Sequence, residues 1–238
     1  MLKIPIDIII PIYNEGEKIY ELLKLFENHI SNKFRVLFCY DSDDDNIFAY
    51  TEKFQEFNFD IKLIKNPNKG PCAAIKQGFI MSNSECVIVY PADDFLNFNI
   101  LDKMYNDFKA GSEIVAASRF IKGGSMKDCP LIKSFLVRAA SYSLYHLSSI
   151  PIKDASNGFR LFSRKVLDAI RIESKVGFAY SLEILVKCNR LNYKITEIPA
   201  KWEERSVGSS RFKVFKWLPQ YLKWYRYGLA TTWLRKKN

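Results

Sequence analysis

Short apolar runs alternate with amphipathic segments along the first half of the chain, and this alternation constrains the fold more than any other feature. The apolar runs have the length and composition of buried strands, and they are IDIIIPIY (6–13), FRVLFCY (34–40), IKLIKN (61–66), CVIVY (86–90) and SEIVAASRF (112–120). Helical segments lie between them, the first with apolar residues at 19, 22, 23, 26 and 30. The pattern predicts an α/β fold whose mostly parallel sheet is covered by helices on both faces.

The second half of the chain is less regular. Residues 131–150 and 179–191 have helical patterns, residues 157–170 read as strand, turn and helix, and residues 193–205 read as a pair of strands. No internal repeat or low-complexity linker divides the chain. We therefore expect one catalytic domain over residues 1–210, followed by a tail over residues 211–238 that forms a basic, aromatic, amphipathic helix.

Polar side chains follow the expected strands. Asn14, Asp41, Lys69, Asp93 and Arg119 all lie just after, or one loop beyond, a strand's carboxyl end, where open α/β sheets bind their ligands. Asp93 is followed by a second carboxylate at position 94, and adjacent acids after a buried strand repel each other unless a cation lies nearby. We expect these side chains to share one crevice that includes a cation.

Several motifs occur in a characteristic order. They are IIIPIYNEGEKIYELL, an acidic cluster after the second strand, NKGPCAAIKQGF, PADD, SRFIKGGS, DASNGFRLFSR and EIPAKWEERSVGSSRF. In this order, from residue 5 to about residue 215, they resemble the family-2 inverting glycosyltransferases of the GT-A (Rossmann-like) fold. The branch that they most resemble is the polyprenol-phosphate (dolichol-phosphate) mannosyl- and glucosyltransferases.

The resemblance implies a hexosyltransferase that moves a sugar from GDP-mannose or a UDP-hexose to polyprenyl phosphate with inversion. The positions that it assigns to the nucleotide sugar and to phosphates are Pro11, Tyr13, Asn14, Glu15, Asp41, Lys69, Gly70, Ala92, Asp93, Arg119, Arg205 and Arg211. Arginine suits phosphate because its planar guanidinium donates paired hydrogen bonds. Arg160 is a further candidate for phosphate binding.

The resemblance also implies a metal ion. Asp93 and Asp94 would hold Mg²⁺ or Mn²⁺, which prefer oxygen ligands, against the donor diphosphate. This chain departs from the family pattern at two places: Tyr40 stands where the first of two aspartates is usual, and Pro91-Ala92-Asp93 replaces Asp-x-Asp. Whether Asp94 replaces the missing carboxylate is left open at this point.

The acceptor decides whether a catalytic base is needed. A phosphate monoester is already an anionic nucleophile at neutral pH, whereas a hydroxyl acceptor requires a base, for which Asp154 and Glu183 are the candidates. Two alternatives therefore remain. One is a family-2 enzyme that acts on a hydroxyl of a cell-surface glycan, and the other is a non-catalytic nucleotide-sugar binder, suggested by Tyr40 and Pro91.

Charge and cysteine content bear on partners and compartment. The net charge is +10, and no acidic residue follows Glu204, while Arg, Lys, Trp, Tyr and Phe alternate through the tail. Such a tail favours an anionic membrane surface over nucleic acid, because nucleic-acid binding would leave the acids after the strands unexplained. The five scattered cysteines form no CxxC pair, which is typical of reduced intracellular proteins. We expect a cytoplasmic protein peripherally associated with the cytoplasmic face of the membrane, with a homo-oligomer or a membrane-protein partner as open possibilities.

Overall fold

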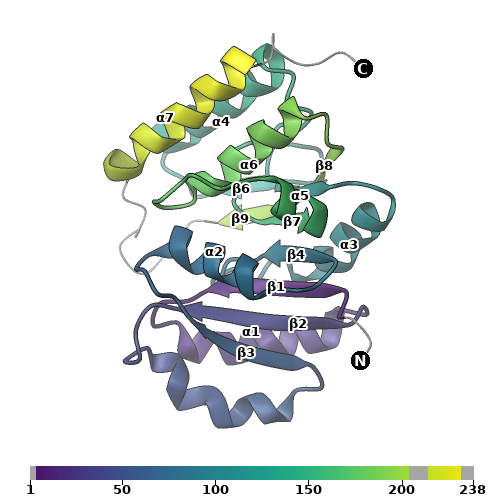
Figure 1. Cartoon of the computed structure of the whole chain (residues 1–238), viewed down its shortest axis with the longest axis vertical. Helices are drawn as coiled ribbons and strands as arrows, with labels where there is room; N and C mark the ends of the chain where they lie inside the picture. Colours follow the sequence, from purple (N-terminus) through teal and green to yellow (C-terminus); the bar gives the residue numbers. More distant parts are fainter. Residues whose placement is uncertain (1–3, 204–213, 232–238) are drawn as a thin grey trace.

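A seven-stranded sheet runs through the middle of the molecule in the order β3-β2-β1-β4-β7-β5-β8. The computed structural model describes residues 4–203 and 214–231 (Figure 1). The strands of this sheet are β1 (Ile6–Pro11), β2 (Phe34–Tyr40), β3 (Asp60–Lys65), β4 (Cys86–Val89), β5 (Ile114–Ser118), β7 (Arg160–Ser163) and β8 (Ile195–Pro199). The mostly parallel α/β sheet that the sequence predicts is confirmed.

One strand runs against the others. β7 pairs antiparallel with both β4 and β5, with Val89 opposite Arg160 and Ala116 opposite Arg160, whereas β1, β2, β3 and β4 are mutually parallel. β5 therefore runs in the same direction as β4, and β8 continues parallel to β5. The carboxyl ends of these parallel strands and the amino end of β7 meet along one edge of the sheet.

Helices cover both faces of the sheet (Figure 1). They are α1 (Gly16–His29), α2 (Pro71–Met81), α3 (Leu101–Lys109), α4 (Leu131–Leu147), α5 (Arg164–Ala169), α6 (Ala179–Arg190) and α7 (Val214–Thr231), with 3₁₀ helices η1 (Asn46–Glu56) and η2 (Phe98–Ile100). Side chains alternate across each strand: Ile9 and Leu37 pack with residues of α2 and α6, whereas Ile8 and Val36 pack with residues of α1 and α3. Two apolar layers therefore enclose the sheet.

A small second sheet lies beside the main one. β6 (Ser125–Lys127) pairs parallel with β9 (Lys201–Glu203), in the register Met126 to Trp202. The two strands predicted over residues 193–205 do form, but as β8 and β9 they are not each other's partners. β8 pairs parallel with β5 in the main sheet. β6 follows β5 and β9 follows β8 along the chain, and these two later strands also pair parallel with each other.

The helix α7 packs against the rest of the structure. Trp224 is buried and donates a hydrogen bond from Nε1 to Ser174 Oγ at 2.8 Å. Gly228 lies against α6 and α4, where an added Cβ would come within 3.0 Å of Val186. Leu218 and Leu222, which helical spacing places on an apolar stripe, are instead exposed. The division of the chain at residue 210 stays a prediction.

None of the helices within residues 4–203 and 214–231 combines the length and the apolar character that a membrane span requires.

Candidate active site

The edge of the sheet where the parallel strands end carries most of the predicted site residues. β1 ends at Pro11, β2 at Tyr40, β4 at Val89 and β5 at Ser118, and the antiparallel β7 begins at Arg160 on the same edge. The loops that follow the parallel strands, and the loop that enters β7, therefore lie along one line. These loops share one edge of the sheet, and each has its own network of hydrogen bonds. That they enclose one crevice with a cation stays a prediction.

The loop after β1 is tied to the acidic cluster after β2. Asn14 has a left-handed backbone with a φ of 54°, and its N–H donates to Asp45 Oδ2 at 2.9 Å. Asn46 in turn accepts from the Gly16 N–H at 2.8 Å, at the start of α1. Tyr13 is exposed, and Glu15 immediately precedes α1. This loop presents Tyr13 and Glu15 at the end of the sheet nearest β1 and β2.

Asp41 organises the loop before α2. Its carboxylate accepts hydrogen bonds from Asn66 Nδ2 and from the Gly70 N–H, both at 2.8 Å. Gly70 has a φ of 98°, a conformation that side chains rarely adopt, and open space surrounds the position of a Cβ. Lys69 is exposed on this loop. Asp41 therefore holds the backbone on which Lys69 is carried.

Asp93 and Asp94 differ in their surroundings. Asp93 is exposed, next to the buried Ala92. Asp94 accepts from the Leu96 and Asn97 N–H groups at 2.9 and 3.0 Å and from Asn97 Nδ2 at 2.7 Å. Burial raises the pKa of Asp94, and these hydrogen bonds oppose that shift. The Asp94 carboxylate therefore caps the turn that follows it, and Asp93 is the one that faces outward.

The turn capped by Asp94 is joined to the second sheet. Asn97 is buried, and it donates from Nδ2 to the Lys201 carbonyl at 2.7 Å and accepts from the Lys201 N–H at 2.8 Å. Lys201 begins β9. The acidic turn and the strand that precedes residues 204–213 are therefore held together. Arg205 and Arg211, which the sequence assigns to phosphate binding, lie outside the described residues.

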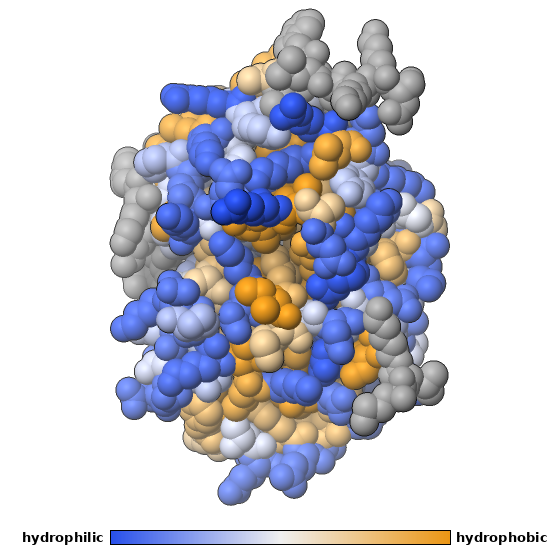
Figure 2. All heavy atoms as spheres, in the orientation of Figure 1, coloured by the Kyte–Doolittle hydropathy of each residue, from blue (hydrophilic) through white to orange (hydrophobic). Residues whose placement is uncertain are grey.

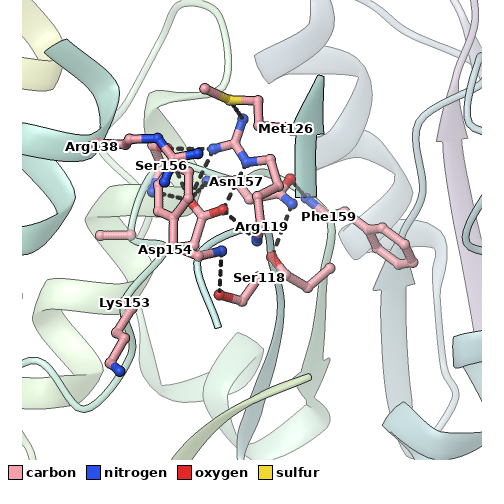
Figure 3. Close-up of polar contacts among 12 residues, drawn as sticks. Ser118, Arg119, Met126, Arg138, Lys153, Asp154, Ser156, Asn157 and Phe159 are labelled. Carbon is pink, nitrogen blue, oxygen red and sulfur yellow. Dashed lines mark hydrogen bonds and ion pairs between the residues drawn. The ribbon is translucent and has the colours of Figure 1, made fainter. Parts of the chain in front are cut away.

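Arg119 and Asp154 form an ion pair at the ends of β5 and of the loop before β7 (Figure 3). Arg119 donates from Nε to Asp154 Oδ2 at 2.7 Å, from Nη2 to Oδ1 at 2.9 Å, and from its backbone N–H to Oδ2 at 3.0 Å. Ser156 Oγ accepts from Arg119 Nη2 at 2.7 Å and donates to Asp154 Oδ1 at 3.0 Å. Asn157 adds a backbone N–H to Oδ1. The guanidinium is thus held in one orientation.

The charge state of Asp154 follows from these contacts. Burial by itself raises the pKa of a carboxyl group, but the positive charge and hydrogen bonds of Arg119 outweigh it. The pKa of Asp154 consequently lies below its ordinary value of 3.8. A carboxylate in this state accepts a proton poorly at neutral pH, so its contacts favour positioning of Arg119 over proton transfer.

Arg160 lies inside the protein. Its side chain is fully buried, and it donates to the carbonyls of Ser181 and Ala155, each at 2.7 Å. Burial lowers the pKa of Arg160 to about 10, which leaves it charged at neutral pH. These contacts tie the loop that carries Asp154 to the first turn of α6. A buried guanidinium does not reach an external phosphate, so direct phosphate binding by Arg160 is not supported by this geometry.

Glu183 is also buried, in the middle of α6. Its two oxygens accept from the backbone N–H groups of Glu173 and Ser174 at 2.7 and 2.8 Å, and Lys187 donates at 2.6 Å. The carboxylate therefore anchors the segment over which α7 packs. Like Asp154, it is occupied by structural partners, and its role as a base stays a prediction that the geometry does not favour.

Residues 7–171, more than half of the chain, match the family described as glycosyl transferase family 2. The chain belongs to glycosyl transferase family 2. Its expected class, a glycosyltransferase of this family, is confirmed.

Several curated relatives of this family 2 chain carry polyprenol-phosphate names. It is 27% identical over 224 residues to the dolichol-phosphate mannosyltransferase of Pyrococcus furiosus, covering 90% of this chain and 61% of that protein. It is 24% identical over 228 residues to the polyprenol monophosphomannose synthase of Mycolicibacterium smegmatis, covering 88% and 85%. It is 29% identical over 234 residues to the dolichyl-phosphate beta-glucosyltransferase of Dictyostelium discoideum, covering 85% and 69%.

Solved structures share the fold of this family 2 chain. The glucosyl-3-phosphoglycerate synthase of Mycobacterium tuberculosis, in complex with UDP, superposes with a TM-score of 0.64 at 13% identity, over 97% of this chain and 79% of that one. The same enzyme has been solved with Mn²⁺ and UDP-glucose and with Mg²⁺ and UDP, at TM-scores of 0.64. At this identity the likeness establishes the GT-A-like fold.

A metal ion in this family 2 chain would depend on few protein ligands. Among the described residues, no three His, Cys, Asp or Glu side chains gather closely enough to enclose a metal ion. Asp93 has an exposed side chain after the strand end, and the Asp94 carboxylate accepts hydrogen bonds from its own turn. A site with one carboxylate fits a Mg²⁺ or Mn²⁺ ion that takes most of its remaining ligands from substrate phosphates and water.

The structure adds two residues to which the sequence analysis assigns no role. Arg138 of α4 lies with its guanidinium carbon 4.6 Å from the ring centre of Phe120, and the Arg119 guanidinium carbon lies 5.1 Å from the same ring. Ser156 completes the clamp on Arg119 (Figure 3). Arg138 is nineteen residues from Arg119 and has no local motif, so only its place on α4 reveals it.

Two surface cavities lie away from this edge. One is lined by Glu113, Lys165, Tyr193 and neighbours at the amino ends of β5 and β8, and the other by Lys76, Ile80, Arg164 and neighbours beside α2 and α5. Neither contains a predicted site residue. The candidate active site is instead an open edge, on which loops from several strands present polar groups.

Proposed function

We propose that this family 2 glycosyltransferase moves a hexose from a nucleotide-diphosphate sugar to polyprenyl phosphate, with inversion at the anomeric carbon. The observation that carries the choice of acceptor is the state of the two candidate bases. Asp154 is clamped to Arg119, and Glu183 is bound by two backbone N–H groups and Lys187. An acceptor that needs no base fits a site in which these carboxylates are already engaged.

The relatives point to the same acceptor class. Three of them are named for transfer of mannose or glucose to dolichyl or polyprenyl phosphate, and the matches cover 85–90% of this chain. The chain spans 61% of the length of the Pyrococcus furiosus relative. The donor, GDP-mannose or a UDP-hexose, is proposed on the same basis.

Each residue has a defined part in the proposed reaction. The nucleoside would lie on the loop that carries Tyr13 and Glu15, next to the Asp41 loop with Lys69 and Gly70. Asp93 would hold Mg²⁺ or Mn²⁺ against the diphosphate, and the ion would neutralise charge that develops on the leaving group. Arg119, fixed by Asp154, would bind phosphate oxygens, and Arg205 and Arg211 remain further candidates for this task.

The proposed step is an in-line displacement. A phosphate oxygen of the acceptor forms a bond to the anomeric carbon on the side opposite the diphosphate. The bond from that carbon to the diphosphate oxygen breaks, and the nucleoside diphosphate leaves with the electron pair. No proton is transferred, because the nucleophile is already an anion. Arg160 and Glu183 would act indirectly, by holding the loops on which the reacting groups are bound.

A lipid-linked acceptor also implies a membrane surface. We propose peripheral association with the cytoplasmic face, and a membrane-protein partner or a homo-oligomer remains a prediction.

The proposed function is tested by nucleotide release from purified protein. GDP-mannose, UDP-glucose and UDP-N-acetylglucosamine are each incubated with Mn²⁺ or with chelator, in the presence and absence of polyprenyl phosphate. We expect release with one donor that needs both the metal ion and the lipid phosphate. Release that is stimulated by a glycan hydroxyl instead would overturn the choice of acceptor. Donor binding without release under any condition would identify a binder that performs no transfer.

A further inference from the structure

The helix α4 presents several of its large apolar residues outward. Leu131 is 88% exposed, Phe135 is 71% exposed and Leu136 is 60% exposed. The opposite side of the helix carries Ser141, which is buried, and Arg138, which lies on Phe120. The same inner side carries Leu144, which is buried in the core, so α4 packs on the core and also exposes large apolar side chains that a helix facing only water would not carry. Exposed apolar residues that form a continuous stripe mark an interaction surface.

The stripe extends along the helix and on to its neighbour. The exposed positions described on α4 are Leu131, Phe135, Leu136, Ala139, Ala140, Tyr142, His146 and Leu147. The helix α7 lies alongside α4 (Figure 1), and Ser143 Oγ is 2.8 Å from Tyr225 OH between them. Leu218 and Leu222 are exposed on α7, and Figure 2 shows apolar patches over α7 among hydrophilic ones. We call these exposed residues of α4 and α7 the α4–α7 face.

The aromatic residues of α7 belong mainly to its inner side. Trp224 is buried against Ser174, Lys187 lies 4.8 Å from the centre of its ring, and Lys223 pairs with Glu173. Within the described part of the tail, Trp224 therefore stabilises the packing of α7 on the rest of the structure. The outward apolar residues are found chiefly on α4, a segment in which the sequence shows only a helix.

Charge identifies what the α4–α7 face fits. Neither helix contains an aspartate or glutamate, whereas α4 carries Lys133 and Arg138 and α7 carries Lys216, Lys223 and Arg226. Arg226 is exposed beside Leu222. Outward leucine and phenylalanine side chains on two helices that contain basic residues and no acidic one match the acyl boundary and headgroups of an anionic bilayer.

We propose that the α4–α7 face binds the surface of an anionic lipid bilayer, and that Leu131, Phe135 and Leu136 of α4 enter its interfacial layer. This surface adjoins the candidate active site, since Tyr142 of α4 stacks with Phe120 at 6.4 Å, next to Arg119. A lipid phosphate held in the same bilayer would approach Arg119 from the side of α4. This last step rests on the proposed function, whereas the binding of vesicles does not.

The proposal is tested by flotation of the full chain with vesicles of phosphatidylcholine alone and of phosphatidylcholine with phosphatidylglycerol. The test variant is L131S/F135S, and the matched control is I80S/M81S, which removes apolar side chains that are 73% and 54% exposed on α2. We expect the unmodified chain and the control to bind anionic vesicles and the test variant to bind at least ~10-fold more weakly, because two inserted apolar side chains are lost. Circular dichroism and a thermal melt establish that both variants fold.

The outcomes separate this surface from the proposed reaction. Equal vesicle binding by L131S/F135S and the unmodified chain would overturn the proposal, as would equal loss in the control. A dimer in solution that the test variant breaks, with vesicle binding absent throughout, would assign the α4–α7 face to a second copy of the chain. Turnover is measured in parallel with a short, water-soluble polyprenyl phosphate. If neither protein turns over this acceptor while vesicle binding behaves as expected, only the proposed function fails.

Discussion

Replacement of Asp154 by asparagine distinguishes a positioning role from a catalytic one. In the structure both oxygens of this carboxylate accept hydrogen bonds, and the donors are Arg119, Ser156 and Asn157. An asparagine amide turned either way places an NH₂ group against N–H donors, and it removes the negative charge opposite Arg119. The D154N variant therefore leaves the Arg119 guanidinium without its negatively charged partner, although the Arg119 side chain is only 11% exposed.

The expected loss of stability is large. Removal of one partner from a buried ion pair costs about 3–5 kcal/mol, a substantial part of the roughly 5–15 kcal/mol by which domains are stable. Urea unfolding, followed by tryptophan fluorescence, should show the transition at a clearly lower urea concentration. The matched control is D43N, whose ion pair with Lys65 is exposed, and this variant should unfold like the unmodified chain.

Turnover completes the test. If Asp154 positions Arg119, D154N should lower kcat/KM for the acceptor and leave the affinity for the donor close to that of the unmodified chain. A D154N protein that is as stable as the unmodified chain but has no turnover at all would refute this reasoning. Asp154 would then be the base of a reaction with a hydroxyl acceptor.

Three further predictions follow from single sites. Arg119 depresses the pKa of Asp154 in the folded state, so the ionised Asp154 contributes to stability above about pH 4, and this contribution is lost as the pH falls through the lower folded pKa. In urea unfolding measured from pH 7 to pH 2, the free energy of unfolding of D154N should therefore fall less with decreasing pH than that of the unmodified chain. D93N should abolish the Mn²⁺ dependence of donor binding in calorimetry, whereas D94N should lower thermal stability through loss of its cap on Asn97 and should retain a response to Mn²⁺; equal effects would contradict the division between the two acids. G177A should destabilise the chain by at least ~1 kcal/mol in urea unfolding, because Gly177 has a φ of 57° and an added Cβ would lie 2.5 Å from Trp217; unchanged stability would place α7 elsewhere.

The first half of the fold follows from the sequence because its strands are buried on both faces. Continuous apolar runs such as IDIIIP and FRVLFCY are typical of strands in a sheet covered on both faces, and their alternation with helices predicts a parallel sheet. Polar residues that follow such strands can also be recognised in the sequence, so Asn14, Asp41 and Asp93 are predicted to lie at one edge of the sheet.

The second half depends on contacts that no local pattern contains. The four residues of β7 read as a strand but do not reveal that it lies between β4 and β5 and runs the opposite way. The three residues of β6 have too little pattern to be recognised. For α4, the same helical spacing fits an inward or an outward apolar side, and only the structure shows which side faces out.

Roles of charged residues were harder to predict than their positions. Asp154 and Glu183 were candidates for a base because of their residue type. Their hydrogen-bond partners favour positioning roles instead, and the base roles stay predictions: Arg119 is 35 residues away from Asp154, and the N–H groups that donate to Glu183 come from a loop nine and ten residues earlier. Likewise, Arg160 has the composition of a phosphate ligand, yet it is buried because β7 is an interior strand.

The interior place of β7 has a consequence for how the chain is made. As the polypeptide leaves the ribosome, β1 to β4 can pair with one another in the order of synthesis, since their partners are already present. β5 emerges next but has no partner strand until β7 (residues 160–163) is synthesised. The unpaired edge of β4 also has no partner until these four residues are made. Such unpaired edges invite pairing with other chains. Completion of the sheet, and with it the alignment of Arg119 and Asp154, is therefore a late event in biosynthesis. A chain shortened before residue 160 lacks both β7 and β8, so it keeps three unpaired strand edges, one on β4 and two on β5, that the finished protein conceals.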